Sequence, residues 1–169
     1  MNDLIIEKHS DYESLNKSLL KEIELIPYDM TNETHLKAKM SEWSVDSPGI
    51  SVIRDWAISL TGAEDIRFVE SHDNGKRLCY CGDCWYARYD KGDYAEEHDH
   101  GKKSISFVYY VNTPVGSSPL YFSEYDTTVD AEEGNIVMFP GNVKHSVPPN
   151  NCDNRVIVAG NLSIMNINI

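Results

Sequence analysis

The chain has 169 residues, which suits one domain that buries roughly two-thirds of its unfolded surface without cross-links. No apolar run approaches the ~20 residues of a membrane span, so no membrane association is expected. The formal net charge of −12 repels phosphate backbones and makes nucleic acid a disfavoured partner. Residues 1–10 lack the basic start and apolar stretch of a signal peptide, which predicts a cytoplasmic location.

Two helices are predicted in the first half of the chain. Ser10 begins a capping-box pattern, and apolar residues then recur every three or four positions, which predicts a helix over about residues 11–25. Ser47 provides an N-cap before a first-turn proline, and the apolar stripe after it predicts a second helix that ends at Gly62. Residues 27–46 have few periodic apolar positions and are expected to form a loop with room for one short strand.

The second half of the chain is predicted to be all-β. Short segments rich in β-branched and aromatic residues alternate there with turn-rich stretches. The predicted strands are residues 78–89, 104–112, 120–123, 135–139 and 155–164. Short strands at this spacing predict a barrel or sandwich, with the N-terminal helices packed on one outer face. We therefore expect a single domain, residues 1–169, with a helical extension at 1–76 and a β core at 77–169.

Three histidines carry the strongest chemical signal: His98-Asp99-His100 and, further on, His145. Alternate residues of a strand point to the same face, so His98 and His100 can present two imidazoles to one ion while Asp99 faces away. An isolated His-x-His pair with acidic neighbours is also typical of a solvated surface loop. The surrounding sequence has to decide between the two interpretations.

Two stretches around these histidines resemble the paired motifs of the cupin and double-stranded β-helix superfamily. Gly92 with His98 and His100 resembles the first motif, and residues 134–140 with His145 resemble the second. The resemblance implies a mainly β jelly roll in which two histidine-bearing strands lie opposite each other, so that the three imidazoles meet. The sequence departs from the cupin pattern because no Glu follows His100 at the expected interval.

A closer resemblance is to the 2-oxoglutarate and Fe(II)-dependent oxygenases, in particular the small prolyl-hydroxylase-like members found in phages and marine bacteria. It covers about residues 78–165 well and the N-terminal helices loosely. The matching segments are residues 89–100, 106–112 and 134–140, followed by His145 and by Arg155 ten residues later. In these oxygenases an arginine at that interval binds the distal carboxylate of 2-oxoglutarate, and a guanidinium grips a carboxylate bidentately.

The resemblance implies roles for individual residues. The three histidines would bind Fe(II) and form the catalytic centre, and Arg155 would bind the cosubstrate 2-oxoglutarate. Tyr110 matches the family tyrosine that shares the same carboxylate, while Tyr109 should point to the other face of the strand. Tyr89 corresponds to another tyrosine that lines the cosubstrate. Taken alone, however, an arginine at the start of a strand is usually a solvated surface residue, as Arg155 could be. Strand tyrosines such as these two usually pack in the core.

Two departures from the oxygenase pattern concern the metal and the cosubstrate. The usual ligand set is two histidines and one carboxylate, and His100 stands where the carboxylate should be. Three histidines leave the same open positions for 2-oxoglutarate and oxygen, but the iron carries one less compensating negative charge. Ile157 stands where many relatives have a serine, so one hydrogen bond to the cosubstrate is expected to be missing.

Three functions are compatible with the sequence. The leading hypothesis is an Fe(II)- and 2-oxoglutarate-dependent oxygenase, a hydroxylase whose substrate is a protein side chain or a small metabolite. The second is a cupin-type metalloenzyme that does not use 2-oxoglutarate and in which Arg155 is dispensable. The third is a non-catalytic β-barrel binding module that tolerates His98→Ala. Substrate choice is expected to lie in the loops at residues 90–97 and 113–119. A homodimer is left open.

The cysteines form a second cluster, because Cys79, Cys81 and Cys84 crowd into six residues while Cys152 lies far away. A structural zinc site would need a second CxxC motif, which the chain lacks. Reduced thiols at a strand turn are the favoured interpretation, with Gly82 and Asp83 making the bend.

Overall fold

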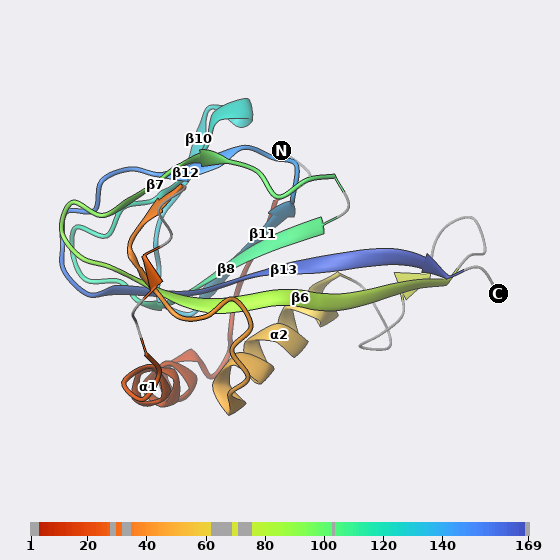
Figure 1. Ribbon diagram of the computed structural model, residues 1–169, viewed down its shortest axis with the longest axis horizontal. Coiled ribbons are helices and arrows are strands. Elements are labelled where there is room, and N and C mark those ends of the chain that lie inside the picture. Colours follow the sequence, from red (N-terminus) through yellow and green to blue (C-terminus); the bar gives the residue numbers. More distant parts are fainter. Residues whose placement is uncertain are drawn as a thin grey trace.

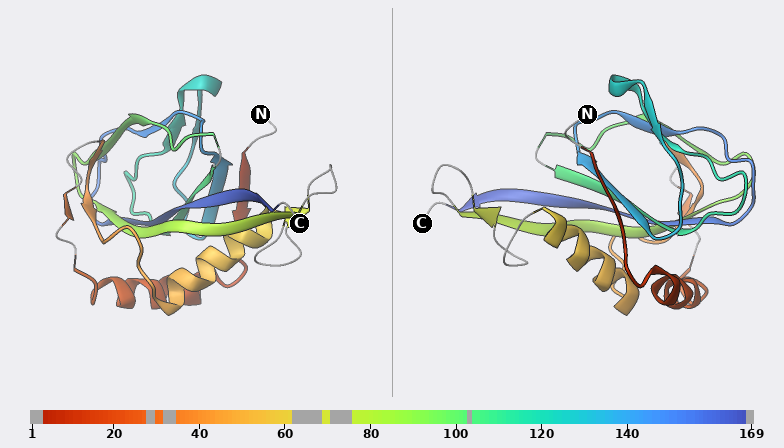
Figure 2. Two further views of the ribbon diagram at one scale, coloured as in Figure 1. Left: turned by 45° about the vertical axis from the view of Figure 1, so that its right-hand side comes forward. Right: turned by 180° about the vertical axis from the view of Figure 1, so that it is seen from behind.

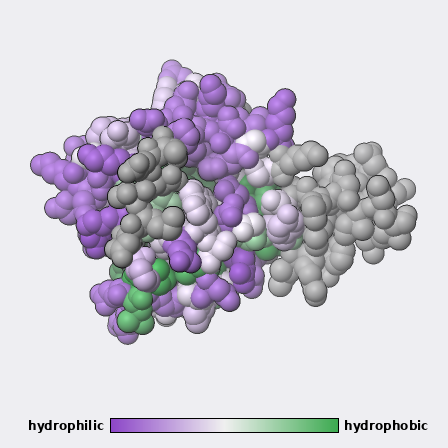
Figure 3. Space-filling view, viewed as in Figure 1, coloured by the Kyte–Doolittle hydropathy of each residue, from purple (hydrophilic) through white to green (hydrophobic). Residues whose placement is uncertain are grey.

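Two antiparallel sheets face each other, and two helices cover the outer face of the larger sheet (Figure 1; Figure 2). The computed structural model describes residues 4–27, 30–31, 35–61, 69–70, 76–102 and 104–167. The arrangement is mainly β and is a jelly roll, or double-stranded β-helix, as predicted. On the face viewed in Figure 3, the described surface is mostly hydrophilic.

The larger sheet has the strand order β1-β11-β8-β13-β6-β4-β2, with β5 paired to β6. Its strands are β1 (Ile5–Lys8), β2 (Met30–Thr31), β4 (Lys39–Met40), β5 (Val69–Glu70), β6 (Lys76–Tyr89), β8 (Ser104–Asn112), β11 (Asn135–Pro140) and β13 (Arg155–Ile167). The long strands β6 and β13 pair along their length and form the backbone of this sheet.

The smaller sheet has the order β10-β9-β12-β7-β3. Its strands are β3 (Leu36–Lys37), β7 (Tyr94–His98), β9 (Leu120–Phe122), β10 (Thr127–Val129) and β12 (His145–Val147). A single 3-10 turn, η1 (Ser123–Tyr125), separates β9 from β10. The smaller sheet therefore carries two of the three histidines that the sequence singled out.

Both predicted helices form, as α1 (Tyr12–Ile23) and α2 (Pro48–Leu60). Ser47 caps α2, and its hydroxyl oxygen accepts a backbone N–H of the first turn at 3.4 Å. The capping box predicted before α1 is not formed, because Asp11 occupies the N-cap and makes no side-chain cap. Gly62, the predicted end of α2, lies outside the described residues. Neither described helix has the length and apolar character that a membrane crossing requires.

Apolar side chains pack on both faces of the larger sheet. Alternation along β8 sends Tyr109 toward the helices and Tyr110 into the space between the sheets, as predicted for neighbouring strand residues. Phe139 of β11 joins Tyr110 between the sheets, and Ile50 of α2 joins Tyr109. The helices thus cover one face of the larger sheet, and the other face is left for the site.

Two local predictions were wrong. Residues 27–46 contain three short strands, because β3 and β4 pair with the distant strands β7 and β6, and β2 pairs with β4, in a segment that has no side-chain period of its own. The turn predicted at Gly82 is absent, since β6 continues through it with a shift in register. Asp83 pairs with Asn161 and Cys81 pairs with the next residue along β13, so Gly82 is the extra residue of a β-bulge.

Candidate active site

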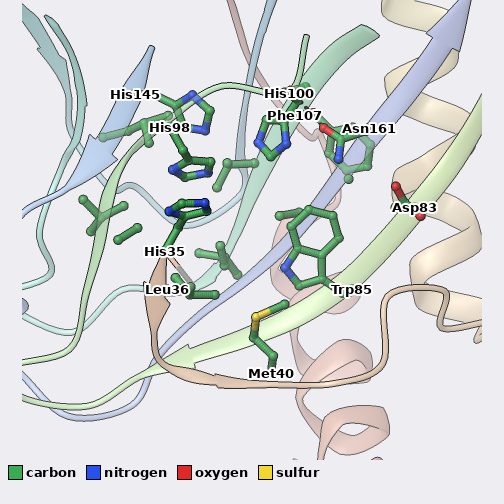
Figure 4. A pocket seen from close by; sticks show the side chains of 18 of the residues that line it. His35, Leu36, Met40, Asp83, Trp85, His98, His100, Phe107, His145 and Asn161 are labelled. Atoms are coloured by element: carbon green, nitrogen blue, oxygen red, sulfur yellow. Dashed lines mark hydrogen bonds between the residues drawn. The ribbon is translucent and has the colours of Figure 1, made fainter. Parts of the chain in front are cut away.

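Three histidines meet between the sheets at one end of the smaller sheet (Figure 4). His98 ends β7 and His145 begins β12, and the two are direct partners across the antiparallel ladder. His100 lies beyond the end of β7, where its backbone N–H donates to the carbonyl of Gly141 at 2.6 Å. One potential ligand atom from each histidine lies within 4.8 Å of the others. The structure therefore brings the three predicted histidines into one group.

Backbone carbonyls orient two of the imidazoles. His98 Nδ1 lies 2.7 Å from the Glu96 carbonyl oxygen, and His145 Nδ1 lies 3.0 Å from the Val143 carbonyl oxygen. A carbonyl only accepts hydrogen bonds, so Nδ1 carries a proton in both rings and Nε2 is the nitrogen that could bind a metal. Metal-bound histidines usually make this second contact, which fixes the ring and the tautomer.

Burial keeps the imidazoles in the form that binds metals. Desolvation lowers the pKa of His145 to about 3, and desolvation together with the nearby His98 lowers the pKa of His100 to about 4. Both rings are therefore neutral at pH 7 and present a lone pair. These two rings can therefore bind a metal cation without first losing a proton.

No carboxylate takes part in the histidine group within the described residues. Asp99, which lies between His98 and His100 in sequence, is exposed, and its Oδ1 accepts the Gly101 N–H at 3.0 Å. His100 reaches the group from a loop, so strand alternation was the wrong reason for expecting its direction. The missing carboxylate noted in the sequence thus persists in three dimensions.

Arg155, the first residue of β13, is fully buried, with 0% of its surface exposed. Its guanidinium carbon lies 4.6 Å from the ring centroid of Tyr89 and 5.5 Å from that of Tyr110. Arg155 Nε and Nη1 and the Tyr110 hydroxyl are buried without a hydrogen-bond partner among the described residues. A buried charge without a counter-charge costs several kcal/mol, so this group is suited to an anion from outside the chain.

The two tyrosines beside Arg155 stay protonated. Burial raises the pKa of Tyr89 to about 12, although the Arg155 guanidinium partly offsets it, and burial also raises the pKa of Tyr110. Each hydroxyl can therefore donate a hydrogen bond to a carboxylate. Ile157, two residues along β13 on the same face, is buried and offers no such donor.

A cavity of about 390 Å³ joins the histidines to Arg155. Tyr89 lines it with Arg155, whereas Tyr110 contacts Arg155 without lining the cavity. Apolar residues of both sheets make up most of the remaining wall, among them Leu120, Phe139, Val147, Ile157 and Ala159. The predicted metal ligands and the predicted cosubstrate arginine therefore face the same enclosed space.

Several lining residues were missed by the sequence analysis. The His35 ring stacks on that of His98, with centroids 6.0 Å apart and planes 6° apart, as Figure 4 shows. Its position depends on the pairing of β3 with β7, because the His35 carbonyl accepts the Glu96 N–H at 2.7 Å. Trp43, Trp85 and Asp83 also line the cavity, from segments where the sequence carries no local signal for a site.

Comparisons with known proteins connect this geometry to a fold. In sequence, the chain matches no protein-family model and no curated protein. The viral collagen prolyl hydroxylase of Paramecium bursaria Chlorella virus-1, solved with 2-oxoglutarate, has a TM-score of 0.67 and 13% identity, over 93% of this chain and 94% of that chain. A Pseudomonas putida prolyl-4-hydroxylase has a TM-score of 0.67 and 15% identity, over 95% and 92%.

A third similar structure is HygX from Streptomyces hygroscopicus, solved with nickel and 2-oxoglutarate. Its TM-score is 0.69 and its identity 9%, over 95% of this chain and 82% of that chain. The chain is thus a double-stranded β-helix protein with a three-histidine group in which His145 is buried and His98 and His100 are half-buried. Its fold is that of the 2-oxoglutarate and Fe(II)-dependent oxygenases, prolyl hydroxylases among them, which confirms the predicted resemblance at the level of fold.

Proposed function

We propose that this protein is a non-haem Fe(II)- and 2-oxoglutarate-dependent oxygenase that hydroxylates its substrate. The observation that carries the proposal is the buried Arg155 guanidinium, whose Nε and Nη1 have no hydrogen-bond partner among the described residues and which shares a cavity with the three grouped imidazoles. A metal ion and a dicarboxylate would each meet a matching partner there. When both are bound, they supply a reaction in which dioxygen is the oxidant: one oxygen atom goes to the succinate formed with loss of CO₂ from 2-oxoglutarate, and the other hydroxylates the substrate.

The donor set fits Fe(II). His98, His100 and His145 would hold the ion, since imidazole is a common iron ligand and three protein ligands leave three positions of an octahedron open. Neutral imidazoles leave the full charge of the ion uncompensated by the protein. A doubly negative 2-oxo acid would balance this charge, which favours a dianionic cosubstrate over a neutral one.

The cavity end beside Arg155 fits the distal carboxylate of 2-oxoglutarate. The guanidinium would bind that carboxylate through two parallel N–H donors, and the Tyr110 hydroxyl, now without a partner, would donate a further hydrogen bond. Tyr89, which stacks on Arg155, would hold the guanidinium in place and line the cosubstrate. The apolar side chains around the histidines would keep water from the reacting atoms.

The proposal extends to the chemical class of the substrate. A prolyl hydroxylase of Trichoplax adhaerens was solved with a hypoxia inducible factor peptide fragment, and HygX was solved with hygromycin B. Structures of this fold therefore include peptide and small-molecule complexes. We propose that a protein side chain or a small molecule is the substrate here.

A second candidate function is favoured by the three-histidine group itself. A cupin-type metalloenzyme that does not use 2-oxoglutarate would bind its metal through the same three histidines, without the Glu of the usual cupin pattern. In that case Arg155 would not be needed for activity. The guanidinium at the deep end of the cavity, with two nitrogens unpaired among the described residues, favours the oxygenase.

Domain organisation and location complete the proposal. The chain would act as one domain, because β1 and β4 of the N-terminal segment are strands of the larger sheet and β3 is a strand of the smaller one. The four cysteines are all free, as they would be in the reducing cytoplasm, where we place the protein. Cys79, Cys81 and Cys84 do not join any metal-binding group among the described residues.

The test is anaerobic titration of the Fe(II)-loaded protein with 2-oxoglutarate, in which bidentate chelation produces a charge-transfer band near ~500 nm. The band should form in the wild type, vanish in His145→Ala and weaken strongly in Arg155→Met. If iron binds but no band forms, and calorimetry detects no 2-oxoglutarate binding, the cupin-type function replaces the oxygenase.

A further inference from the structure

The two ends of the cavity have opposite chemistry. Arg155 pairs with Tyr89, and Asn161 pairs with Asp83, six residues further along the same ladder. At about 3.3 Å per residue this separation is roughly 20 Å. Arg155 is fully buried whereas Asp83 is exposed, so the guanidinium marks the deep end and the carboxylate marks the mouth.

A β-bulge turns Asp83 toward the cavity. Cys79 is buried in the core on the helix side of the sheet, and Cys81 packs against that core. Strict alternation along β6 would point Asp83 the same way. The extra residue at Gly82 reverses the alternation, so that Asp83 lines the cavity together with Trp85.

Aromatic side chains form the wall beside this carboxylate. Trp43 and Trp85 meet edge to face, with ring centroids 4.9 Å apart and planes at 68°. Trp85 is 7% exposed, while Trp43 is 41% exposed and stands at the mouth. Figure 4 shows Trp85, Met40 and Asp83 on the side of the cavity away from His145. An indole face attracts a cation as well as an apolar chain.

No positive group of the described residues competes for this carboxylate. Among the residues that line the cavity, Arg155 is the only lysine or arginine, and it lies at the deep end. None of the described residues donates a hydrogen bond to the Asp83 carboxylate or pairs with it. The net charge of −12 adds a long-range attraction for cations.

We infer that Asp83, Trp43 and Trp85 form a subsite for an alkylammonium group of the primary substrate. Asp83 accepts hydrogen bonds from the ammonium, and the two indoles pack against the carbon chain and the cation. The chain then runs along the apolar wall toward the histidines. This inference rests on the proposed function only for its role in substrate selection. A prolyl side chain carries no charge and would leave Asp83 unused.

The experiment is calorimetric titration of the Fe(II)-loaded protein under anaerobic conditions, with and without 2-oxoglutarate. The probes are N-acetyl-lysine methylamide, its uncharged counterpart N-acetyl-norleucine methylamide, N-acetyl-proline methylamide and n-butylammonium. The lysine probe should bind at least about 10-fold more tightly than the other amides, because a hydrogen bond to a charged group is worth about 1.5–3 kcal/mol. If n-butylammonium binds as tightly as the lysine probe, the ammonium group of the substrate belongs to a free amine. If n-butylammonium binds much more weakly, the ammonium group belongs to a lysine side chain.

Matched variants test the residues. Asp83→Asn should reduce lysine-probe affinity about 10-fold or more, and Trp43→Leu should reduce it about 2- to 5-fold. Glu124→Gln removes the same charge from an exposed position outside the cavity and should leave the affinity unchanged. Lysine binding that is no tighter than norleucine or proline binding, or that is insensitive to Asp83→Asn, overturns the inference.

Failure of this inference can be told apart from failure of the proposed function. The 2-oxoglutarate charge-transfer band is measured separately and should be unchanged in Asp83→Asn and Trp43→Leu, because both residues lie away from Arg155. A normal band without lysine binding overturns only the ammonium subsite. Lysine binding to protein that forms no band supports the subsite and overturns the oxygenase function.

Discussion

Replacing Arg155 by methionine separates two effects of its buried charge, the effect on the free energy of unfolding and the effect on the affinity for 2-oxoglutarate. In the protein without cosubstrate, the guanidinium is fully buried and two of its nitrogens have no hydrogen-bond partner among the described residues. Substituting buried charges with apolar side chains of similar length is often neutral or stabilising by about 1–4 kcal/mol. Arg155→Met should therefore leave the free energy of unfolding unchanged or raise it by up to about 4 kcal/mol.

The same substitution should abolish most of the affinity for 2-oxoglutarate. Two charge-assisted hydrogen bonds at about 1.5–3 kcal/mol each amount to about 3–6 kcal/mol. This loss corresponds to a roughly 10²- to 10⁴-fold larger dissociation constant for 2-oxoglutarate. At a cosubstrate concentration of about 100 times the wild-type constant, the wild type gains about 2.7 kcal/mol of stability, and the variant should gain almost none.

Urea denaturation of the Fe(II)-loaded protein, with and without 2-oxoglutarate under anaerobic conditions, measures both effects. Arg54→Met serves as the control, because Arg54 is partly exposed on α2 and lies outside the cavity. A clear loss of stability in Arg155→Met without cosubstrate would mean that the guanidinium has a structural partner. Retention of 2-oxoglutarate affinity within about threefold would refute the assigned role of Arg155.

Three further substitutions, with Asp99→Ala as a control for the first, test the metal group and the fold. His100→Ala should lower Fe(II) affinity more than about 100-fold in a chelator competition, since loss of an outer-shell partner alone costs 10–100-fold, whereas Asp99→Ala should change it less than about threefold. Gly160→Ala should lower the unfolding free energy by about 1–3 kcal/mol in urea, because a Cβ there would lie 2.5 Å from Phe107 Cζ. Ser47→Ala should cost about 1 kcal/mol by thermal denaturation, through loss of the α2 cap.

The elements with a strong side-chain pattern were predictable. The strand at Ser104–Asn112 was predicted with its observed bounds, and the other four predicted strands differ from the structure by a few residues at their ends. Alternation also placed Tyr109 and Tyr110 on opposite faces. A buried strand determines its own pattern, because each of its side chains must match the face it covers.

The residues at the mouth of the cavity could not be predicted from the sequence, because their positions depend on long-range strand pairing and on a β-bulge. His35 and Trp43 come from a segment in which two-residue strands exist only because distant strands pair with them. Asp83 faces the cavity only because β6 has one residue more than β13 at Gly82. The pattern of apolar residues along one segment reveals neither which distant strand pairs with it nor where a bulge occurs. The histidines and Arg155 could be found because their spacing in sequence matches a known motif.

The distribution of charge along the β6–β13 ladder implies an order of binding. The positive end of the cavity is deep and the negative end is at the mouth, and the opposite sheet carries His98 and His145. A dianion that enters at this mouth passes the Asp83 carboxylate on its way to Arg155, and an ammonium already bound there would hinder it. If 2-oxoglutarate binds first, its charge is matched by the metal and Arg155, and the mouth remains negative for the substrate. Preincubation with saturating lysine probe should therefore slow formation of the charge-transfer band in stopped-flow mixing, whereas the norleucine probe should not; equal rates would argue against a shared entrance.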